Sequence, residues 1–156
     1  FHIVGGLEAD IQFWQKQCNG LSNIRFWGYV PHQETVRYHL AFDVVLLPNQ
    51  EFVGTAGKKS KTNISQWTSP LKAFEYMAAG KPIICSDLPV LQEVFEHNVN
   101  ALLCPPTDLK AWQNALEYLR DDLKLRKRLG KTAKQIFLKK FSWQARAKNI
   151  LEDIGG

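Results

Sequence analysis

A helix with its own start and stop signals is encoded by Thr68–Pro82, TSPLKAFEYMAAGKP. Ser69 is a good N-cap, Pro70 suits the first helical position, and Gly80 suits the left-handed residue after the last turn. The proline that closes the stretch prevents the helix from continuing, and the apolar Ile83–Cys85 that follows predicts a buried strand. The stretch therefore predicts a loop, a helix of about ten residues, a tight turn and a strand.

One side of this helix carries polar groups that suit an anionic ligand. Ser69, Lys72 and Glu75 are spaced by three and project in roughly the same direction. Lys72 lies in the first turn, where the helix dipole disfavours a cation unless an anion is bound. Backbone N–H groups and a lysine make a phosphate site, and Glu75 can accept hydrogen bonds from sugar hydroxyls. We expect a nucleotide diphosphate and its ribose here, with a surface Lys72–Glu75 ion pair as the alternative.

Length and composition indicate one globular domain. The chain has 156 residues, 45% of them hydrophobic and 22% charged, which is enough to bury a core. No apolar run approaches the roughly 20 residues of a membrane span, and no signal-peptide pattern opens the chain. The first residue is Phe1 rather than Met and begins a strand-like run, so we expect the chain to be a piece of something longer.

The net charge indicates the type of partner, and the cysteines indicate the cellular compartment. A formal net charge of +5 favours anionic partners, from nucleotides to acidic lipid surfaces. Three cysteines cannot all pair and show no metal-ligand spacing, so no metal is expected. Cys85 and Cys104 lie in apolar runs and are predicted to be buried thiols of a reducing compartment. We expect a cytoplasmic protein, with a peripheral position at the cytoplasmic face of the membrane as an alternative.

Short apolar strands alternate with helices along the chain, which is typical of βα units and predicts an α/β fold with a parallel sheet flanked by helices. The expected strands are Phe1–Val4, Ile24–Trp27, Val44–Leu47, Ile83–Cys85 and Ala101–Cys104. The expected helices are Leu7–Asn19, His32–Phe42, Ser69–Ala79, Pro89–Glu96, one capped by Asp108, and one from Leu123 to Ile150 with a break near Lys140–Trp143.

The helices are expected to turn apolar sides inward. The predicted inner residues are Leu7, Ile11, Trp14 and Cys18 in the first helix, Leu71, Phe74 and Ala78 in the central helix, and Leu109, Trp112, Leu116 and Leu119 after Asp108. The lysines and arginines between residues 124 and 140 are expected to form a solvated face. Contact of this face with lipid or another acidic partner is the alternative.

Ligands bind parallel sheets where the carboxyl ends of the strands meet. The predicted segments just past those ends are Gly5-Gly6, Gly28–Pro31, Asn49–Ser69 and Ser86-Asp87, and we expect them to converge with the first turn of the central helix. Gly5 and Gly6 allow a tight turn close to a ligand or a neighbouring backbone. The lysine-rich stretch Asn49–Trp67 is long for a compact domain, and it either folds over a diphosphate or is a solvated loop.

Several motifs together resemble one enzyme family. They are Ile3–Gly6 (IVGG), Asn23–Pro31 (NIRFWGYVP), Ser69–Pro82 (SPLKAFEYMAAGKP), Asn100–Pro106 (NALLCPP) and Phe141–Trp143 (FSW). With them the chain resembles, over nearly all its residues, the C-terminal donor-binding domain of a retaining GT-B glycosyltransferase of group 1 (family 4). The resemblance implies a Rossmann-like parallel sheet flanked by helices, the C-terminal half of a GT-B fold, lacking its first βα unit.

The resemblance also implies roles for individual positions. They are Ser69, Pro70, Leu71 and Lys72 beside the donor diphosphate, Glu75 on the ribose, and Gly28, Tyr29, Val30 and Pro31 as the turn against the base. Trp67, eight residues before Glu75, stands where many relatives carry a glutamate that contacts the donor sugar. This departure concerns the donor-sugar contact and not the family.

We therefore expect residues 1–156 to be the N-terminally truncated nucleotide-sugar-binding domain of a glycosyltransferase. By resemblance, the whole enzyme transfers a sugar from a nucleotide diphosphate sugar to a glycan or lipid-linked acceptor, with retention of configuration and without a cofactor. The acceptor domain, with the catalytic residues, lies outside this chain, so the fragment alone is expected to be inactive. The alternative is a non-catalytic nucleotide-binding α/β regulatory module; nucleic acid is not an expected partner, because no base-reading motif is present.

Overall fold

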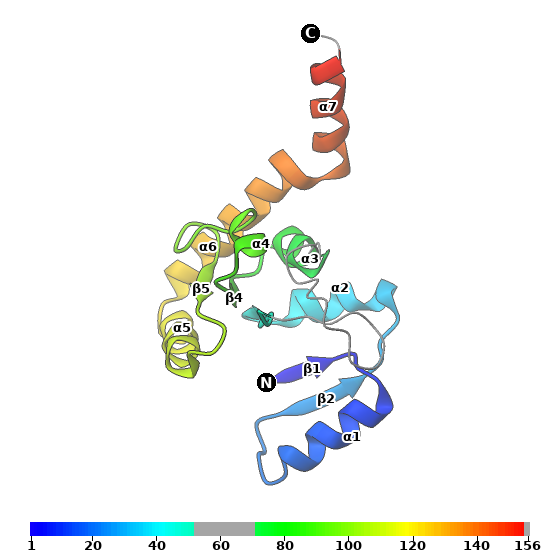
Figure 1. The fold of residues 1–156 in the computed structure, drawn as a ribbon, viewed down its shortest axis with the longest axis vertical. Helices are drawn as coiled ribbons and strands as arrows, with labels where there is room; N and C mark the ends of the chain where they lie inside the picture. Colours follow the sequence, from blue (N-terminus) through cyan, green and yellow to red (C-terminus); the bar gives the residue numbers. More distant parts are fainter. Residues whose placement is uncertain (52–70, 155–156) are drawn as a thin grey trace. The chain divides into compact units, whose positions relative to one another are not determined.

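The computed structural model describes residues 1–51 and 71–154 and divides into two compact units, Phe1–Tyr38 (unit 1) and His39–Gly156 (unit 2). Its strands are β1 (His2–Val4), β2 (Arg25–Gly28), β3 (Val45–Leu47), β4 (Ile83–Ser86) and β5 (Leu102–Cys104) (Figure 1). Its helices are α1 (Glu8–Gln17), α2 (His32–Ala41), α3 (Leu71–Ala79), α4 (Pro89–Gln92), α5 (Leu109–Asp121), α6 (Leu123–Ile136) and α7 (Trp143–Ile154), with the π-helical η1 (Phe137–Phe141) before α7.

The strand pairs of the described residues are parallel, as predicted. In unit 1, β1 pairs with β2; in unit 2 the order is β3-β4-β5. Val45 of β3 lies opposite Ile83 of β4, and Ile84 lies opposite Leu102 of β5. Every residue of β4 is buried, which fits a central parallel strand covered on both faces. The predicted α/β fold is confirmed, with its strands divided between two sheets.

Unit 1 has a small core centred on Ile11. This residue is 9% exposed and lies against Gly6 and Gly28, where a β-carbon added to Gly6 would be 3.3 Å from the Ile11 side chain. The prediction that Leu7 and Trp14 also face inward is wrong, because they are 74% and 55% exposed. A two-stranded sheet offers too little area to cover a whole helix face, so one isoleucine carries the contact between α1 and the strands.

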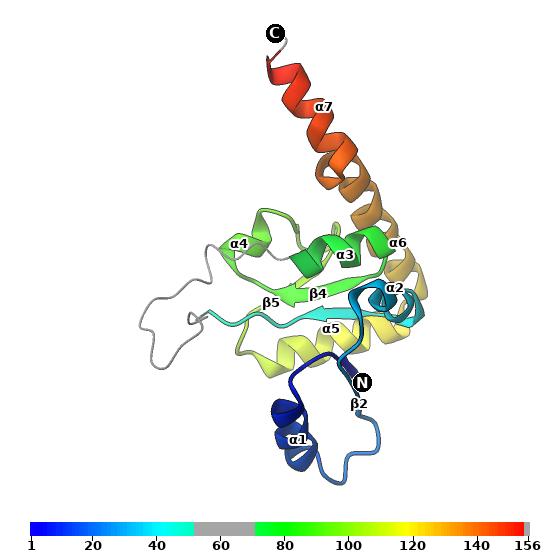
Figure 2. The ribbon, with the colours of Figure 1, turned by 90° about the vertical axis from the view of Figure 1, so that its right-hand side faces the viewer.

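Unit 2 is a layered structure with helices on both faces of its sheet. Figure 2 shows α3 on one face and α5 on the other. Alternate residues of β4 enter different cores, because successive strand side chains point to opposite faces. The core on the α3 face contains Val45, Leu47, Ala73, Met77, Ile83, Cys85, Leu91, Phe95, Ala101 and Ala133, and the core on the α5 face contains Ile84, Leu102, Cys104, Ala115, Leu119, Leu125 and Leu129.

In unit 2, the prediction that two further residues face the core is wrong. Leu71 is 71% exposed and Leu109 is 82% exposed, both at the first position of their helices. Ala73 and Met77 are fully buried instead and form the inner side of α3. Small or unbranched residues let a helix approach the sheet closely, and apolar spacing alone cannot distinguish that side from a neighbouring apolar one.

Helix α4 ends at Gln92, four residues earlier than the predicted Glu96. The buried Asn100 explains the difference. Its side-chain oxygen accepts a hydrogen bond from the backbone N–H of Glu96 at 2.7 Å, and its amide donates to the carbonyl of Val94 at 3.0 Å. These bonds satisfy backbone groups that a continuing helix would have used.

The two long helices that follow are capped by aspartates. The Asp108 carboxylate accepts a hydrogen bond from the backbone N–H of Ala111 at 3.0 Å, which confirms the predicted N-cap of α5. Asp122 does the same for α6, with the N–H of Leu125 at 2.8 Å. Each such cap stabilises its helix by about 1 kcal/mol. The predicted break near 140–143 is confirmed by η1 and by the start of α7 at Trp143.

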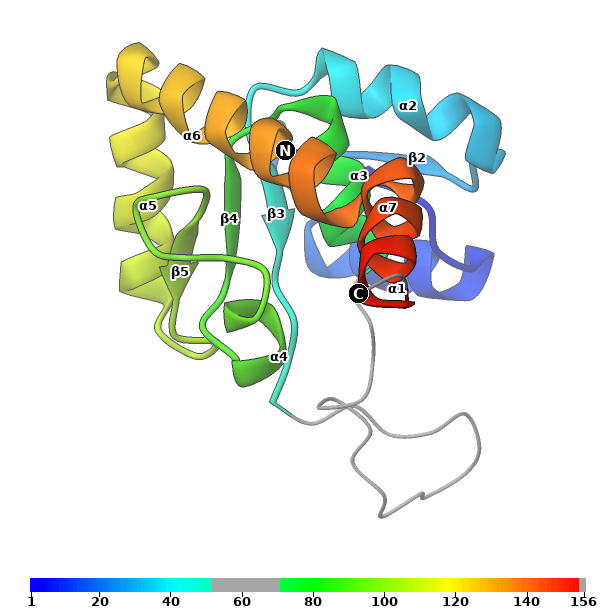
Figure 3. The same cartoon turned by 90° about the horizontal axis from the view of Figure 1, so that it is seen from above.

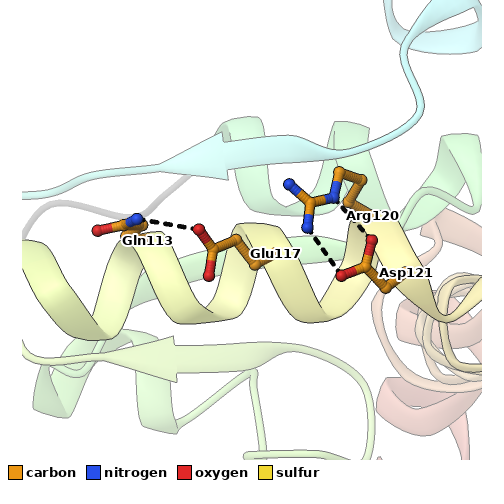
Figure 4. Close-up of polar contacts among 4 residues, drawn as sticks. All are labelled: Gln113, Glu117, Arg120 and Asp121. Atoms are coloured by element: carbon orange, nitrogen blue, oxygen red, sulfur yellow. Dashed lines mark hydrogen bonds and ion pairs between the residues drawn. The ribbon is translucent and has the colours of Figure 1, made fainter.

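The outer side of α5 is covered by paired polar groups (Figure 4). The amide of Gln113 donates to Glu117 at 2.9 Å, and the Arg120 guanidinium donates two hydrogen bonds to Asp121, at 2.7 and 2.8 Å. These groups are exposed, so they contribute to solubility more than to stability. None of the helices in the described ranges is long and apolar enough to cross a membrane.

Candidate functional site

The amino end of α3 lies at the edge of the unit 2 sheet where the strands end. Residues 80–82 join the carboxyl end of α3 directly to the start of β4, so the helix and the strand run in opposite directions. Figure 2 shows this antiparallel path, with the first turn of α3 beside the carboxyl end of β4. This is the edge at which parallel α/β sheets bind ligands.

The first turn of α3 is accessible. Leu71 is 71% exposed, Lys72 is exposed, and Glu75 is half-buried one turn further along. The backbone N–H groups of this turn have no partner within the helix, and a lysine stands beside them. The turn therefore offers hydrogen-bond donors and a positive charge to an anion. Thr68, Ser69 and Pro70, with the predicted cap, lie outside the described residues, as does Trp67.

Tyr76, the residue after Glu75, packs against His39 in the middle of α3. Its ring makes an edge-to-face contact with the ring of His39, with centroids 5.1 Å apart. Burial, and then the neighbouring charge of Glu75, raises the pKa of Tyr76 above 10.0. The phenol is therefore protonated at neutral pH and adds no negative charge beside an anion site.

The carboxyl end of α3 is held by a hydrogen-bonded cap. The N–H of Gly80 donates to the carbonyl of Met77 at 3.0 Å, and the N–H of Lys81 donates to the carbonyl of Tyr76 at 3.4 Å. This pattern is a Schellman cap, and it requires the left-handed φ of +68° observed at Gly80. The Lys81 ammonium donates to the carbonyl of Leu40 at 2.7 Å, which links the cap to the last turn of α2.

Ser86 joins the carboxyl ends of the strands in unit 2. Its buried hydroxyl lies 2.7 Å from the carbonyl of Asn49, to which it donates, and 3.4 Å from that of Leu47. The N–H of Asp87 donates to the carbonyl of Cys104 at 2.8 Å. The sequence placed Ser86-Asp87 just past a strand end at the ligand edge, but it did not predict that the Ser86 hydroxyl bonds to the neighbouring strand end. A hydroxyl that follows an apolar buried run is the signal that was available, because a buried hydroxyl needs a partner.

The two glycine turns of unit 1 lie side by side. The N–H of Gly5 donates to the carbonyl of Gly28 at 2.7 Å, and Gly5, Gly6 and Gly28 all have positive φ angles, of 98°, 99° and 69°. Tyr29 is 80% exposed after the second turn. The ends of β1 and β2 therefore converge within unit 1, as those of β3, β4 and β5 do within unit 2. The stretch Asn49–Trp67 is described only as far as residue 51.

The cysteine thiols and the side chains that can bind metals form neither a disulfide nor a metal site among the described residues. The cysteines are free, and Cys85 and Cys104 are buried, as predicted. Burial, with smaller contributions from Cys104 and Asp87, raises the pKa of Cys85 to about 12. Within residues 1–51 and 71–154, no group of three His, Cys, Asp or Glu side chains is arranged to hold a metal ion.

The chain is similar in sequence to known glycosyltransferases. Residues 1–136 match the family model described as "Glycosyl transferases group 1". A curated relative, the amylovoran biosynthesis glycosyltransferase AmsK of Erwinia amylovora, is 32% identical over 107 residues. That alignment covers 69% of this chain and 24% of the relative. The chain thus spans about a quarter of that protein.

Solved structures share the fold. Anabaena HepE in complex with UDP superposes with a TM-score of 0.76 at 20% identity, covering 99% of this chain and 40% of HepE. Sucrose-phosphate synthase from Thermosynechococcus elongatus gives 0.74 at 24% identity, covering 97% of this chain and 36% of the synthase. A glycosyltransferase from Rickettsia africae gives 0.75 at 16% identity, covering 97% and 38%. At these identities the likeness shows the fold.

Proposed function

Because this chain belongs to the group 1 glycosyl transferases, we propose that it is the donor-binding part of an enzyme that moves a sugar from a nucleotide diphosphate sugar to an acceptor. HepE has been solved with UDP and with UDP-glucose, which supports a nucleotide sugar as the partner. AmsK, named for amylovoran biosynthesis, supports a glycan as the product class. We further propose that the sugar keeps its anomeric configuration when it is transferred.

The observation that carries this proposal is the accessible first turn of α3 at the strand-end edge of unit 2. Breaking the bond between sugar and diphosphate leaves negative charge on the diphosphate. The first-turn N–H groups and Lys72 would stabilise that charge without reorganising, and preorganised donors of this kind usually make the largest single contribution to catalysis. Glu75, one turn along on the same side, would accept hydrogen bonds from the ribose hydroxyls.

Further features of the site and of the whole protein are proposed from the sequence alone. They are Ser69 and Pro70 beside the diphosphate, the turn Gly28–Pro31 beside the base, a glycan or lipid-linked acceptor bound by a further domain, and a cytoplasmic location. Catalytic residues are proposed to lie in that domain, so this chain should bind nucleotide without transferring sugar. Neither the family match nor AmsK favours the alternative of a non-catalytic regulatory module.

Isothermal titration calorimetry with UDP, GDP and ADP tests the site and identifies the base. We expect Lys72→Ala and Glu75→Ala each to weaken binding of the preferred nucleotide by about 1–3 kcal/mol, the scale of a lost charged hydrogen bond. The matched control is Lys110→Ala. Lys110 is also exposed and also the second residue of a helix, α5, so it tests whether any lysine in a first turn has the same effect.

Unchanged affinity in both α3 variants, or an equal loss in Lys110→Ala, would refute the proposed site. The glycosyltransferase assignment needs a separate measurement on the full-length protein. Release of nucleoside diphosphate from a nucleotide sugar in the presence of acceptor would support it. Anomeric analysis of the product by NMR would then decide between retention and inversion.

A further inference from the structure

Positive charge is concentrated in the last fifth of the chain. Residues 123–151 contain half of the 20 lysines and arginines of the chain and no aspartate or glutamate. The remaining residues carry the other ten basic side chains against 15 acidic ones, so the rest of the chain is net acidic. The basic residues of the segment are Lys124, Arg126, Lys127, Arg128, Lys131, Lys134, Lys139, Lys140, Arg146 and Lys148.

The arginines and the lysines of helix α6 have different surroundings. Its inner side is formed by Leu125, Leu129 and Ala133, which are buried in the core of unit 2. Arg126 reaches Asp43 at 3.6 Å, and Arg128 donates two hydrogen bonds to Asn98. These two arginines therefore bind polar groups in other parts of unit 2, whereas no ion pair or side-chain hydrogen bond joins the lysines of α6 to another described residue.

The lysines of α6 form one exposed stripe. Lys124, Lys127, Lys131 and Lys134 are all exposed and follow one another at spacings of three, four and three residues. At 100° per residue they fall within about 80° of the helix circumference, along a helix about 21 Å long. None of them forms an ion pair with a described residue, in contrast to the paired polar side chains on α5 (Figure 4). We call these four residues the α6 stripe.

The segment that follows the α6 stripe adds exposed apolar groups to more cations. Leu138 is 57% exposed and Trp143 is 83% exposed, and the exposed Lys139 and Lys140 lie between them in the chain. Lysine beside exposed tryptophan and leucine is the combination found at the surface of a bilayer, where cations meet lipid phosphates and the indole lies at the headgroup level. Lysines and an exposed tryptophan could also contact a nucleic acid, but the exposed Leu138 beside them suits the apolar boundary of a bilayer and not a phosphate backbone.

We propose that the α6 stripe, with Leu138 and Trp143, docks unit 2 on an anionic lipid surface. The position of α6 in unit 2 suits this role. Figures 2 and 3 show α6 beside the amino ends of the strands, opposite the edge where α3 begins, and Arg126 contacts Asp43 just before β3. A bilayer bound by the α6 stripe would leave the edge with Lys72 and Glu75 open. The docking surface is therefore independent of the proposed donor site.

Co-sedimentation with vesicles tests the proposal. We expect the chain to bind vesicles of phosphatidylcholine with about 30% phosphatidylserine, and to bind pure phosphatidylcholine at least tenfold more weakly. Binding should fall steeply between about 0.1 M and 0.5 M salt, because the attraction is electrostatic. Each lysine near an anionic surface contributes about fivefold, so reversing three charges in Lys124→Glu/Lys127→Glu/Lys131→Glu should reduce binding by at least about 100-fold.

A charge-matched control separates the surface from net charge. Lys16→Glu/Arg37→Glu/Lys110→Glu changes the net charge equally at exposed positions outside residues 123–151 and should retain most of the binding. Circular dichroism melting would confirm that both variants fold. Trp143→Ala should weaken binding by a factor that does not change with salt, because its contribution is apolar.

Three results would overturn the proposal: equal binding to both vesicle types, equal losses in the two triple variants, or full binding by the α6 variant. Binding of DNA instead of vesicles, abolished by the same α6 variant, would also overturn it by assigning the α6 stripe to nucleic acid. Nucleotide affinity measured on the α6 variant should equal that of the parent chain. Failure of the donor site would thus be distinguished from failure of the lipid surface.

Discussion

Gly130 of α6 lies against Gly80 at the end of α3, with backbone in direct contact with backbone. A β-carbon placed on Gly130 would overlap the carbonyl oxygen of Gly80 and lie 3.0 Å from its carbonyl carbon. Lys134, one turn along α6, covers Gly80 with its aliphatic stem. The end of α3 is therefore clamped on α6, while the beginning of α3 is left exposed at the opposite edge.

The first prediction concerns this contact. Alanine at Gly130 would gain about 1 kcal/mol from helix propensity. It must also push two backbones apart, and overpacking of this kind costs about 1–3 kcal/mol or more. Because the overlap is with backbone, we expect the cost at the upper end, about 3 kcal/mol, so that Gly130→Ala lowers the free energy of unfolding in urea by about 2 kcal/mol net. Gln135→Ala, at an exposed position of the same helix, should change it by less than about 0.5 kcal/mol. A Gly130→Ala protein as stable as the parent would show that α6 can move away from Gly80.

The second prediction concerns Ser86. Removing its hydroxyl in Ser86→Ala leaves the carbonyl of Asn49 without its donor, and an unsatisfied buried acceptor costs about 1–3 kcal/mol. We expect urea denaturation to show a loss in this range, together with weaker nucleotide binding, because the segment after β3 is no longer held at the strand ends. Ser22→Ala, at an exposed position, serves as the control. A loss of stability without any change in nucleotide affinity would limit Ser86 to a structural role.

The third prediction concerns Arg128. Its two nitrogens donate to the carbonyl and the side-chain oxygen of Asn98, at 2.8 and 2.7 Å. Asn98 has a positive φ of 59°, so the arginine holds a strained turn in place. Lysine cannot reproduce the two-pronged geometry, and we expect Arg128→Lys to lose about 0.5–1 kcal/mol in thermal or urea unfolding. The adjacent, exposed Lys127→Ala should lose almost nothing, and an equal loss there would contradict the assignment.

The fourth prediction concerns alkaline pH. The unfolded chain ionises Cys85 near the ordinary pKa of 9.0, whereas the folded protein keeps this thiol protonated up to about 12. Between these values the unfolded state binds fewer protons, so the free energy of unfolding falls as pH rises, by up to about 1.4 kcal/mol per pH unit. Raised pKa values of Tyr76 and Cys104 act in the same direction. Urea titrations between about pH 8 and 10.5 should show this slope, and Cys85→Ala should flatten it; an unchanged slope would assign the effect to other groups.

Much of the fold follows from local chemistry and could be predicted. Asp108 caps α5 because its carboxylate accepts a hydrogen bond from the free N–H of Ala111, the third residue of the helix. Gly80 ends α3 because few other residues adopt a positive φ. The alternation of apolar strands with helices predicted parallel strand pairing, because a chain in which each strand is followed by a helix has few other ways to cover its strands. In the candidate site, the exposure of Lys72 agrees with its predicted place on the polar side of that helix.

The errors all concern which residues meet across space. Leu71 and Leu109 looked like core residues, yet Ala73 and Ala115 are buried instead. Helical spacing shows that a helix has apolar residues on one side, but the shape of the neighbouring sheet decides which side is buried. Ser86 was also missed as a strand clamp, because its partner Asn49 lies 37 residues away in the chain.

The sequence by itself determined the end of α3 at Gly80, the cap of α5 at Asp108, the parallel α/β order and the family, because caps, glycine turns and apolar periodicity act over a few residues. Only the tertiary structure decided that α3 is clamped at Gly80 and open at Lys72, and that the α6 stripe lies at the other edge of unit 2. Those relationships depend on backbones and side chains distant in the chain coming into contact. No local pattern encodes how closely two such segments approach.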